Sequence, residues 1–352
     1  MKRVAVFFLV LVLGCWFYYN QRPKKSFPKI IPKKIISPTT KIDKKQFVSE
    51  DLFIPYWTFD KNFVLDNNYD RAIFFDPDFS HIGSFVDRTK DFTYEKYITV
   101  KIDKYEQMTP EQIENVITIV KENNLNGLVL DLEIPIVFTD DNKAQINSFV
   151  KLFYTTAKKN YKSFNVVMYG DLFYRKRGYD LPFINQHSDE IFVMAYDFHK
   201  AGGEPGPNFQ FAAFASASAS QGRYDYDFKN MTEDYLKYVP ADKLNIVFGM
   251  YGYDWTVDEK KRPLKPARAL TLNEIKKEFL GKCQWKDCLI NRDEQTKETE
   301  INYVIPYKLE NNLMDEELHI IWFEDEESVR IKTEYLKEKG IGKISYWGYG
   351  YF

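Results

Sequence analysis

"NGLVLDLE", residues 126–133, begins as a buried strand would and ends in two carboxylates. Because side chains alternate along a strand, Asp131 and Glu133 lie on the same face as Val129, and three leucines lie on the other face. The rise of a strand puts the two acids about 6–7 Å apart, close enough for one carboxylate to raise the pKa of the other. These residues alone fit a catalytic pair and a strand running out into solvent equally well.

Beyond residue 50 the chain alternates short apolar runs with amphipathic stretches, such as 109–124, 140–160 and 325–340. The last of these ends at Gly340, as a helix C-terminus commonly does. Eight strand-like runs separated by helices predict an α/β protein with a (β/α)8 TIM barrel. An open doubly wound sheet is the alternative, but no glycine-rich phosphate loop follows any strand. The runs are 51–57, 71–75, 97–102, 127–133, 164–170, 190–197, 244–252 and 341–348.

Acids and aromatic residues gather where these strands are expected to end. Active sites of such barrels lie at the C-terminal ends of the strands. Any one of these residues could be a large core residue, but together they have the composition of a sugar-binding cleft. They are Tyr56, Trp57, Asp131, Glu133, Tyr169, Tyr196, Asp197, Tyr251 and Trp347.

Composition and charge exclude several classes of function. The net charge is −2, but residues 1–46 hold eleven Lys/Arg and one Asp, so the remainder has 38 basic and 50 acidic residues, a net −12. An acidic body of this kind is a poor nucleic-acid binder. The four histidines lack zinc-site spacing, and no G-x-S-x-G elbow is present. We therefore expect no metal, no cofactor and no nucleic-acid partner.

The N-terminal segment differs from the rest of the chain. Residues 4–19 are sixteen residues without a charge, longer than a typical signal-peptide core, and no A-x-A-like cleavage site follows them. We expect residues 1–20 to be a signal anchor or transmembrane segment, 21–46 a Lys/Pro-rich tether, and 47–352 a catalytic domain outside the cytoplasm. The basic residues that follow the apolar segment argue against export, because the positive-inside rule would keep them in the cytoplasm. Because "VLGC" loosely resembles a lipobox, lipid modification or cleavage at Cys15 stays an alternative.

Four motifs in order give the chain a resemblance to the family 18 glycoside hydrolases over roughly residues 50–352. "NGLVLDLE" is similar to the strand-four motif D-G-x-D-x-D-x-E, although Asn126 and Val129 replace its first and middle aspartates. "MAYD" (194–197), "GMYGYDW" (249–255) and "ISYWGYG" (344–350) are similar to the motifs of strands six, seven and eight. The loop after "MAYD" and a small insertion between strands 7 and 8, at about 256–340, resemble bacterial spore-cortex and cell-wall members.

The resemblance implies a retaining hydrolase that cleaves β-1,4 bonds next to N-acetylglucosamine. Chitin-like glycans, peptidoglycan and other surface glycans all contain this sugar. Glu133 would be the general acid/base, with Asp131 and Tyr196 holding the acetamido group that acts as the nucleophile. Trp347 would form the floor under the sugar. The other implied substrate-binding residues are Asp197, Met194, Tyr56 and Tyr251.

Val129 raises two questions. Since Val129 cannot exchange a proton with Asp131, we expect Asp131 to ionise more readily than in the family. A non-catalytic, membrane-anchored, lectin-like protein on the same barrel is the alternative function, which Val129 favours and Glu133 opposes.

Cys283 and Cys288, five apart in the insertion, would form a disulfide in an exported protein.

Overall fold

The computed structural model describes residues 47–352 except 48, 60–62, 65–67, 105–107, 136, 138, 213–225 and 309–313. The expected signal anchor, the tether and Cys15 lie outside these residues. Among the described residues, no helix combines the length and the apolar character needed to cross a membrane.

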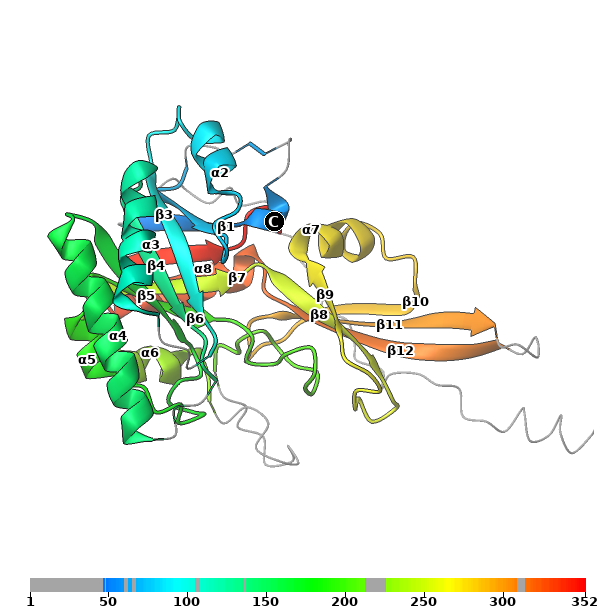
Figure 1. Cartoon of the computed structure of the whole chain (residues 1–352). Coiled ribbons are helices and arrows are strands. Elements are labelled where there is room, and N and C mark those ends of the chain that lie inside the picture. Colours follow the sequence, from blue (N-terminus) through cyan, green and yellow to red (C-terminus); the bar gives the residue numbers. More distant parts are fainter. Residues whose placement is uncertain are drawn as a thin grey trace, which may run out of the picture.

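Eight parallel strands close into a barrel in the order β1-β13-β7-β6-β5-β4-β3-β2, with helices outside them (Figure 1). The first and last strands pair with each other, with Phe53 opposite Trp347. The predicted TIM barrel is therefore confirmed. Its strands are β1 (Ser49–Pro55), β2 (Arg71–Phe75), β3 (Glu95–Ile102), β4 (Gly127–Leu132), β5 (Ser163–Tyr169), β6 (Ile191–Ala195), β7 (Leu244–Gly249) and β13 (Lys343–Trp347).

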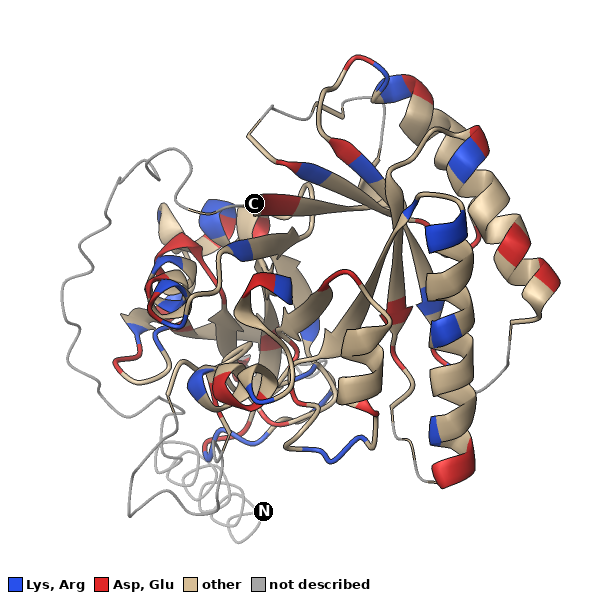
Figure 2. Cartoon of the chain, turned by 90° about the vertical axis from the view of Figure 1, so that its left-hand side faces the viewer, with Lys and Arg blue, Asp and Glu red and all other residues tan. Residues whose placement is uncertain are grey.

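Local sequence chemistry sets the ends of the outer helices. Thr109 and Gln112 form a reciprocal capping box at the start of α3, and Asp325 caps α8 in the same way with Ser328. Figure 2 shows acidic and basic residues on the outer helices, which is usual for faces turned toward solvent. The helices are α2 (Ile82–Arg88), α3 (Pro110–Glu122), α4 (Asp140–Lys159), α5 (Leu181–Gln186), α6 (Phe228–Leu236) and α8 (Glu326–Glu338).

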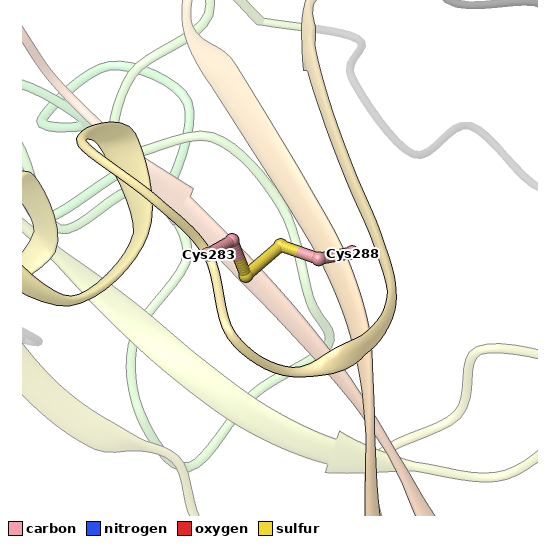
Figure 3. Close-up of a disulfide and its surroundings, with 2 residues drawn as sticks. All are labelled: Cys283 and Cys288. Carbon is pink, nitrogen blue, oxygen red and sulfur yellow. A yellow bond between two sulfur atoms is a disulfide. The ribbon is translucent and has the colours of Figure 1, made fainter.

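A five-stranded antiparallel sheet, in the order β10-β11-β12-β8-β9, stands between β7 and β13 in the chain. It is the predicted insertion, but it starts at Tyr251 and ends at Phe323, so α8 follows the sheet rather than belonging to it. Figure 3 shows the Cys283–Cys288 disulfide in this insertion, as predicted. Its strands are β8 (Tyr251–Val257), β9 (Arg268–Thr271), β10 (Lys286–Arg292), β11 (Thr299–Lys308) and β12 (Met314–Phe323), with the short helix α7 (Leu272–Ile275) between β9 and β10.

A buried polar network joins strands inside the barrel. Asp51 in β1 accepts hydrogen bonds from Arg71 in β2 and Asn245 in β7, each at 2.7 Å. Ser345 in β13 also donates to Asn245, at 2.7 Å. Since a buried charge is tolerated only when it is paired and hydrogen-bonded, this network fixes the strands relative to one another beneath the site.

Candidate active site

The two acids of the opening motif differ sharply in their surroundings. Asp131 is 5% exposed, and its Oδ1 has no hydrogen-bond partner within the described structure. Burial, and after it the charge of Glu133, raises the pKa of Asp131 well above its usual value, while Lys101 partly opposes the shift. Glu133 follows the end of β4, and its side chain is 31% exposed. One acid is thus buried and the other faces solvent at the barrel mouth, the C-terminal end of the strands.

The expectation that Asp131 ionises more readily than in the family compares this chain with one that has an aspartate at position 129, and it stays a prediction. Against the usual value of an aspartate, the surroundings of Asp131 move its pKa in the upward direction. Val129 is itself fully buried beneath Asp131. An apolar neighbour in a closed barrel disfavours the carboxylate form, so the pKa of Asp131 moves upward.

Three contacts hold Glu133 in place. Its backbone N–H donates to the carbonyl of Ile102 at 2.8 Å, and its own carbonyl accepts from the Tyr169 hydroxyl at 2.6 Å. Lys101 donates to Oε1 of Glu133 at 3.0 Å. The sequence analysis did not assign Lys101 to the site. A signal for it existed, because a lysine near the end of an otherwise apolar strand has to face a charge or solvent.

Tyr196 follows β6 and lies near both acids. Burial is the largest cause that raises the pKa of Tyr196 well above 10, and the charges of Asp131 and Glu133 come next. The hydroxyl of Tyr196 therefore stays protonated at neutral pH and is available as a hydrogen-bond donor. Its ring centroid lies 6.0 Å from that of Tyr251.

Asp197 is held from several sides. Its φ of 61° is unusual for a residue other than glycine. Asn208 accepts the backbone N–H of Asp197 at 2.7 Å. The hydroxyls of Tyr251 and Tyr253 both donate to Oδ1 of Asp197, the second at 2.8 Å. The structure thus brings together Tyr196, Asp197 and Tyr251 as predicted, and it adds Tyr253 and Asn208.

The aromatic half of the mouth is built on β1, β2 and β13. Trp347, which precedes a cis peptide bond, packs against Phe75 and Trp57 with ring centroids 5.1 and 6.1 Å apart. Tyr56 contacts Trp57 and stacks on His81 at 4.9 Å. Tyr56 is 39% exposed and Trp57 51% exposed, so both rings present a face to solvent.

Lys101 links the two halves of the mouth. Its ammonium lies 5.9 Å from the centre of the Phe75 ring, which in turn packs on Trp347. Met194, the remaining predicted binding residue, is the last but one residue of β6 and is 7% exposed. Every predicted site residue thus lies at the C-terminal end of a barrel strand or just beyond it.

Asp76, Asp78 and His81 form one group in the described part of the chain whose ligand atoms lie within 4.8 Å of one another, near enough to hold a cation. These carboxylates already have partners. Asp76 accepts the backbone N–H of His81 at 2.7 Å, and Asp78 accepts the hydroxyl of Ser80 at 2.7 Å. We assign the group a structural role in the turn after β2.

A closed barrel with acids at the end of its fourth strand and aromatic rings around its mouth is the architecture of the TIM-barrel glycoside hydrolases. The model of glycosyl hydrolases family 18 matches residues 90–351, and the chain belongs to this family.

Known proteins support this assignment. The chain is 22% identical over 271 residues to an endochitinase of Brugia malayi, covering 73% of this chain and 51% of that protein. It is 25% identical over 170 residues to the cortical fragment-lytic enzyme of Bacillus anthracis, covering 46% of this chain and 31% of that protein. The chain thus spans from about a third to about half of these curated relatives.

Solved structures share the fold. A group IV chitinase of Ostrinia furnacalis in complex with allosamidin has a TM-score of 0.68 at 17% identity, covering 85% of this chain and 91% of that one. The spore cortex-lytic enzyme SleL of Bacillus cereus has a TM-score of 0.60 at 16% identity, covering 88% and 72%.

Proposed function

We propose that the protein is a retaining hydrolase of β-1,4 bonds next to N-acetylglucosamine, with Glu133 as general acid/base. The arrangement of Glu133 carries this proposal. Its carboxylate is at the barrel mouth, fixed by backbone and side-chain contacts, and lies beside a buried acid whose pKa is raised. Two carboxyl groups in such different environments are suited to two different roles.

The proposed reaction has two halves. In the first, Glu133 gives a proton to the glycosidic oxygen as the acetamido oxygen of the sugar attacks the anomeric carbon and forms an oxazolinium ion. In the second, Glu133 takes a proton from a water molecule, which opens the oxazolinium ion and restores the starting configuration. Asp131 accepts the acetamido N–H, and the Tyr196 hydroxyl donates to the acetamido oxygen.

Asp131 is the rival nucleophile, because it is the other carboxyl group of the motif. Its burial works against this role, since burial raises the pKa of Asp131 and so disfavours the free carboxylate that a nucleophile needs. A buried acid facing the acetamido group is better suited to orienting that group, and the positive charge of the oxazolinium ion would favour the ionised form of Asp131 as it develops.

For the remaining predicted residues we propose binding roles. Trp347 gives an apolar floor under the sugar, and Asp197, held by two tyrosines, binds sugar hydroxyls. Met194 and Tyr251 line the acetamido side, and Tyr56 extends the aromatic surface to a further sugar.

For the natural substrate we propose a chitin-like glycan, peptidoglycan or another surface glycan, reached outside the cytoplasm from a membrane anchor at residues 1–20. The similarity to a cortical fragment-lytic enzyme supports a bacterial wall glycan, and the similarity to an endochitinase supports a chitin-like one. The Cys283–Cys288 disulfide supports an oxidising location.

Incubation with a chromogenic N-acetylglucosaminide oligomer tests the proposal. We expect turnover by the wild type and a loss of about 10²–10⁴-fold in Glu133→Gln, which keeps the shape of the side chain but cannot donate an acidic proton. Glu122→Gln on the exposed end of α3 is the matched control and should retain full activity. Binding of a chitooligosaccharide, measured by calorimetry, should survive in Glu133→Gln.

Two results would overturn the proposal. A Glu133→Gln enzyme with half of the wild-type activity would remove Glu133 from the role of acid. A wild type that binds the oligomer without cleaving it would support the lectin-like alternative, which rests on Val129.

A further inference from the structure

Lys101 stands at the centre of the site without a role in the reaction described above. Its ammonium, on β3, donates to Oε1 of Glu133 at 3.0 Å, and its side chain is 27% exposed. The strand register places Lys101 directly opposite Asp131 of β4. One cation thus lies next to both acids of the motif.

The environment of Asp131 explains why a cation is useful here. Position 129, one step deeper on the same face, is an apolar valine that is fully buried. On its own strand face, Asp131 therefore has Glu133 as an acidic neighbour and no carboxyl group beneath it. Two adjacent carboxylates repel each other, and a cation beside them lowers that repulsion.

We propose that Lys101 is a positioning residue of the reaction: its ammonium holds the Glu133 carboxylate at the barrel mouth and keeps the Asp131–Glu133 pair at one negative charge in the free enzyme. This inference rests on the proposed function, because it assigns Lys101 a part in the work of Glu133. The direction of the shift at Asp131 supports it, since burial and the Glu133 charge raise the pKa of Asp131 and so favour keeping one proton on the pair, the proton that Glu133 donates in the first half of the reaction.

Other charged and titratable groups face the pair from each neighbouring strand, and they set the field in which Lys101 acts. The tyrosines stay neutral over the working range because burial raises the pKa of each. The remaining groups are the same in the wild type and in a Lys101→Met variant, so they do not account for a difference between the two. The facing groups are Asp103 beyond β3, Tyr169 on β5, Arg177 near Tyr169, and Tyr196 with Asp197 beyond β6.

The test is the pH dependence of kcat/KM on an uncharged chromogenic N-acetylglucosaminide, for the wild type, Lys101→Met and Lys101→Arg. Without the cation, the pair binds its protons more tightly. We therefore expect both limbs of the bell-shaped profile in Lys101→Met to move to higher pH by about one unit. Lys101→Arg should restore the wild-type profile. Lys104→Met, which changes an exposed lysine just beyond β3, is the matched control and should leave it unchanged.

A second measurement does not depend on turnover. The affinity of a thiazoline analogue of N-acetylglucosamine, followed against pH by calorimetry, should shift in the same direction in Lys101→Met. If the profiles of wild type and Lys101→Met coincide in both measurements, or if arginine fails to restore the wild-type profile, the inference is wrong. If the wild type cleaves no N-acetylglucosaminide at all, the proposed function itself fails, which is a different result from coinciding profiles in an active enzyme.

Discussion

Asp131→Asn separates what the buried acid does for the reaction from what it costs the fold. The substitution keeps the size and shape of a side chain that is 5% exposed, so packing is preserved and the charge is lost. Two unit charges about 4 Å apart interact by about 4 kcal/mol at an effective dielectric constant of 20. If Asp131 is the counter-charge of the oxazolinium ion, its loss should lower kcat by about 10³-fold.

The same variant should be more stable than the wild type at neutral pH. The folded-state pKa of Asp131 lies well above the usual 3.8. The folded chain therefore holds this proton after the unfolded chain has released it, and stability falls as pH rises above about 4 toward the folded pKa. Asparagine has no charge to bury, so Asp131→Asn should not lose stability over this pH range.

Two assays decide the matter. Turnover of the chromogenic oligomer gives the loss in kcat, and calorimetric unfolding at pH 7 and below pH 4 gives the change in Tm. The expected result is a higher Tm for Asp131→Asn at pH 7 and no difference below pH 4. A variant that keeps more than a tenth of the activity, or that unfolds at a lower temperature at pH 7, would refute the reasoning.

Three further predictions concern the disulfide, the buried lysine and the substrate. Cys283→Ser should lower the free energy of unfolding by about 2 kcal/mol, because the bridge closes a short loop, and thiol titration of the unreduced wild type should find neither Cys283 nor Cys288 free. Lys332→Met should cost about 3–5 kcal/mol in denaturant unfolding, because Lys332 and Glu298 are both fully buried and the carboxylate would lose its counter-charge. Chemically deacetylated glycan should be inert, which chromatography of the products detects, and the product of acetylated glycan should keep the β-anomer, which NMR detects. Equal cleavage of the two glycans would rule out the acetamido oxygen as nucleophile.

The features that could be predicted from the sequence are those that repeat along the chain. Eight apolar runs with helices between them predict the barrel, and the position of Asp131 and Glu133 at the end of one run predicts the site. Gly127 belongs to the motif that the sequence shows, and the structure supplies the reason for it, since a Cβ at this position would lie 2.3 Å from the Ser163 carbonyl oxygen of the neighbouring strand.

The features that could not be predicted arise between strands that are distant in sequence. The contact of Lys101 with Glu133 depends on the register of β3 against β4, and a shift by one residue would turn Lys101 to the other face. The pKa of Asp131 depends on burial, which is a property of the closed barrel. The resemblance to family 18 identified a missing aspartate at position 129, but only the structure shows that Lys101 of the neighbouring strand lies opposite Asp131.

The pairing of β1 with β13 has a consequence for how the protein is made. Trp347, the proposed floor under the sugar, belongs to the strand that closes the barrel, and its partner in register is Phe53. During synthesis the first strand emerges long before the last, so both edges of the growing sheet wait unpaired until residues 343–347 arrive. A chain interrupted in the insertion would already contain both acids of β4, yet it would have an open sheet and no sugar floor. Completion of the barrel and appearance of the proposed activity are therefore expected to coincide.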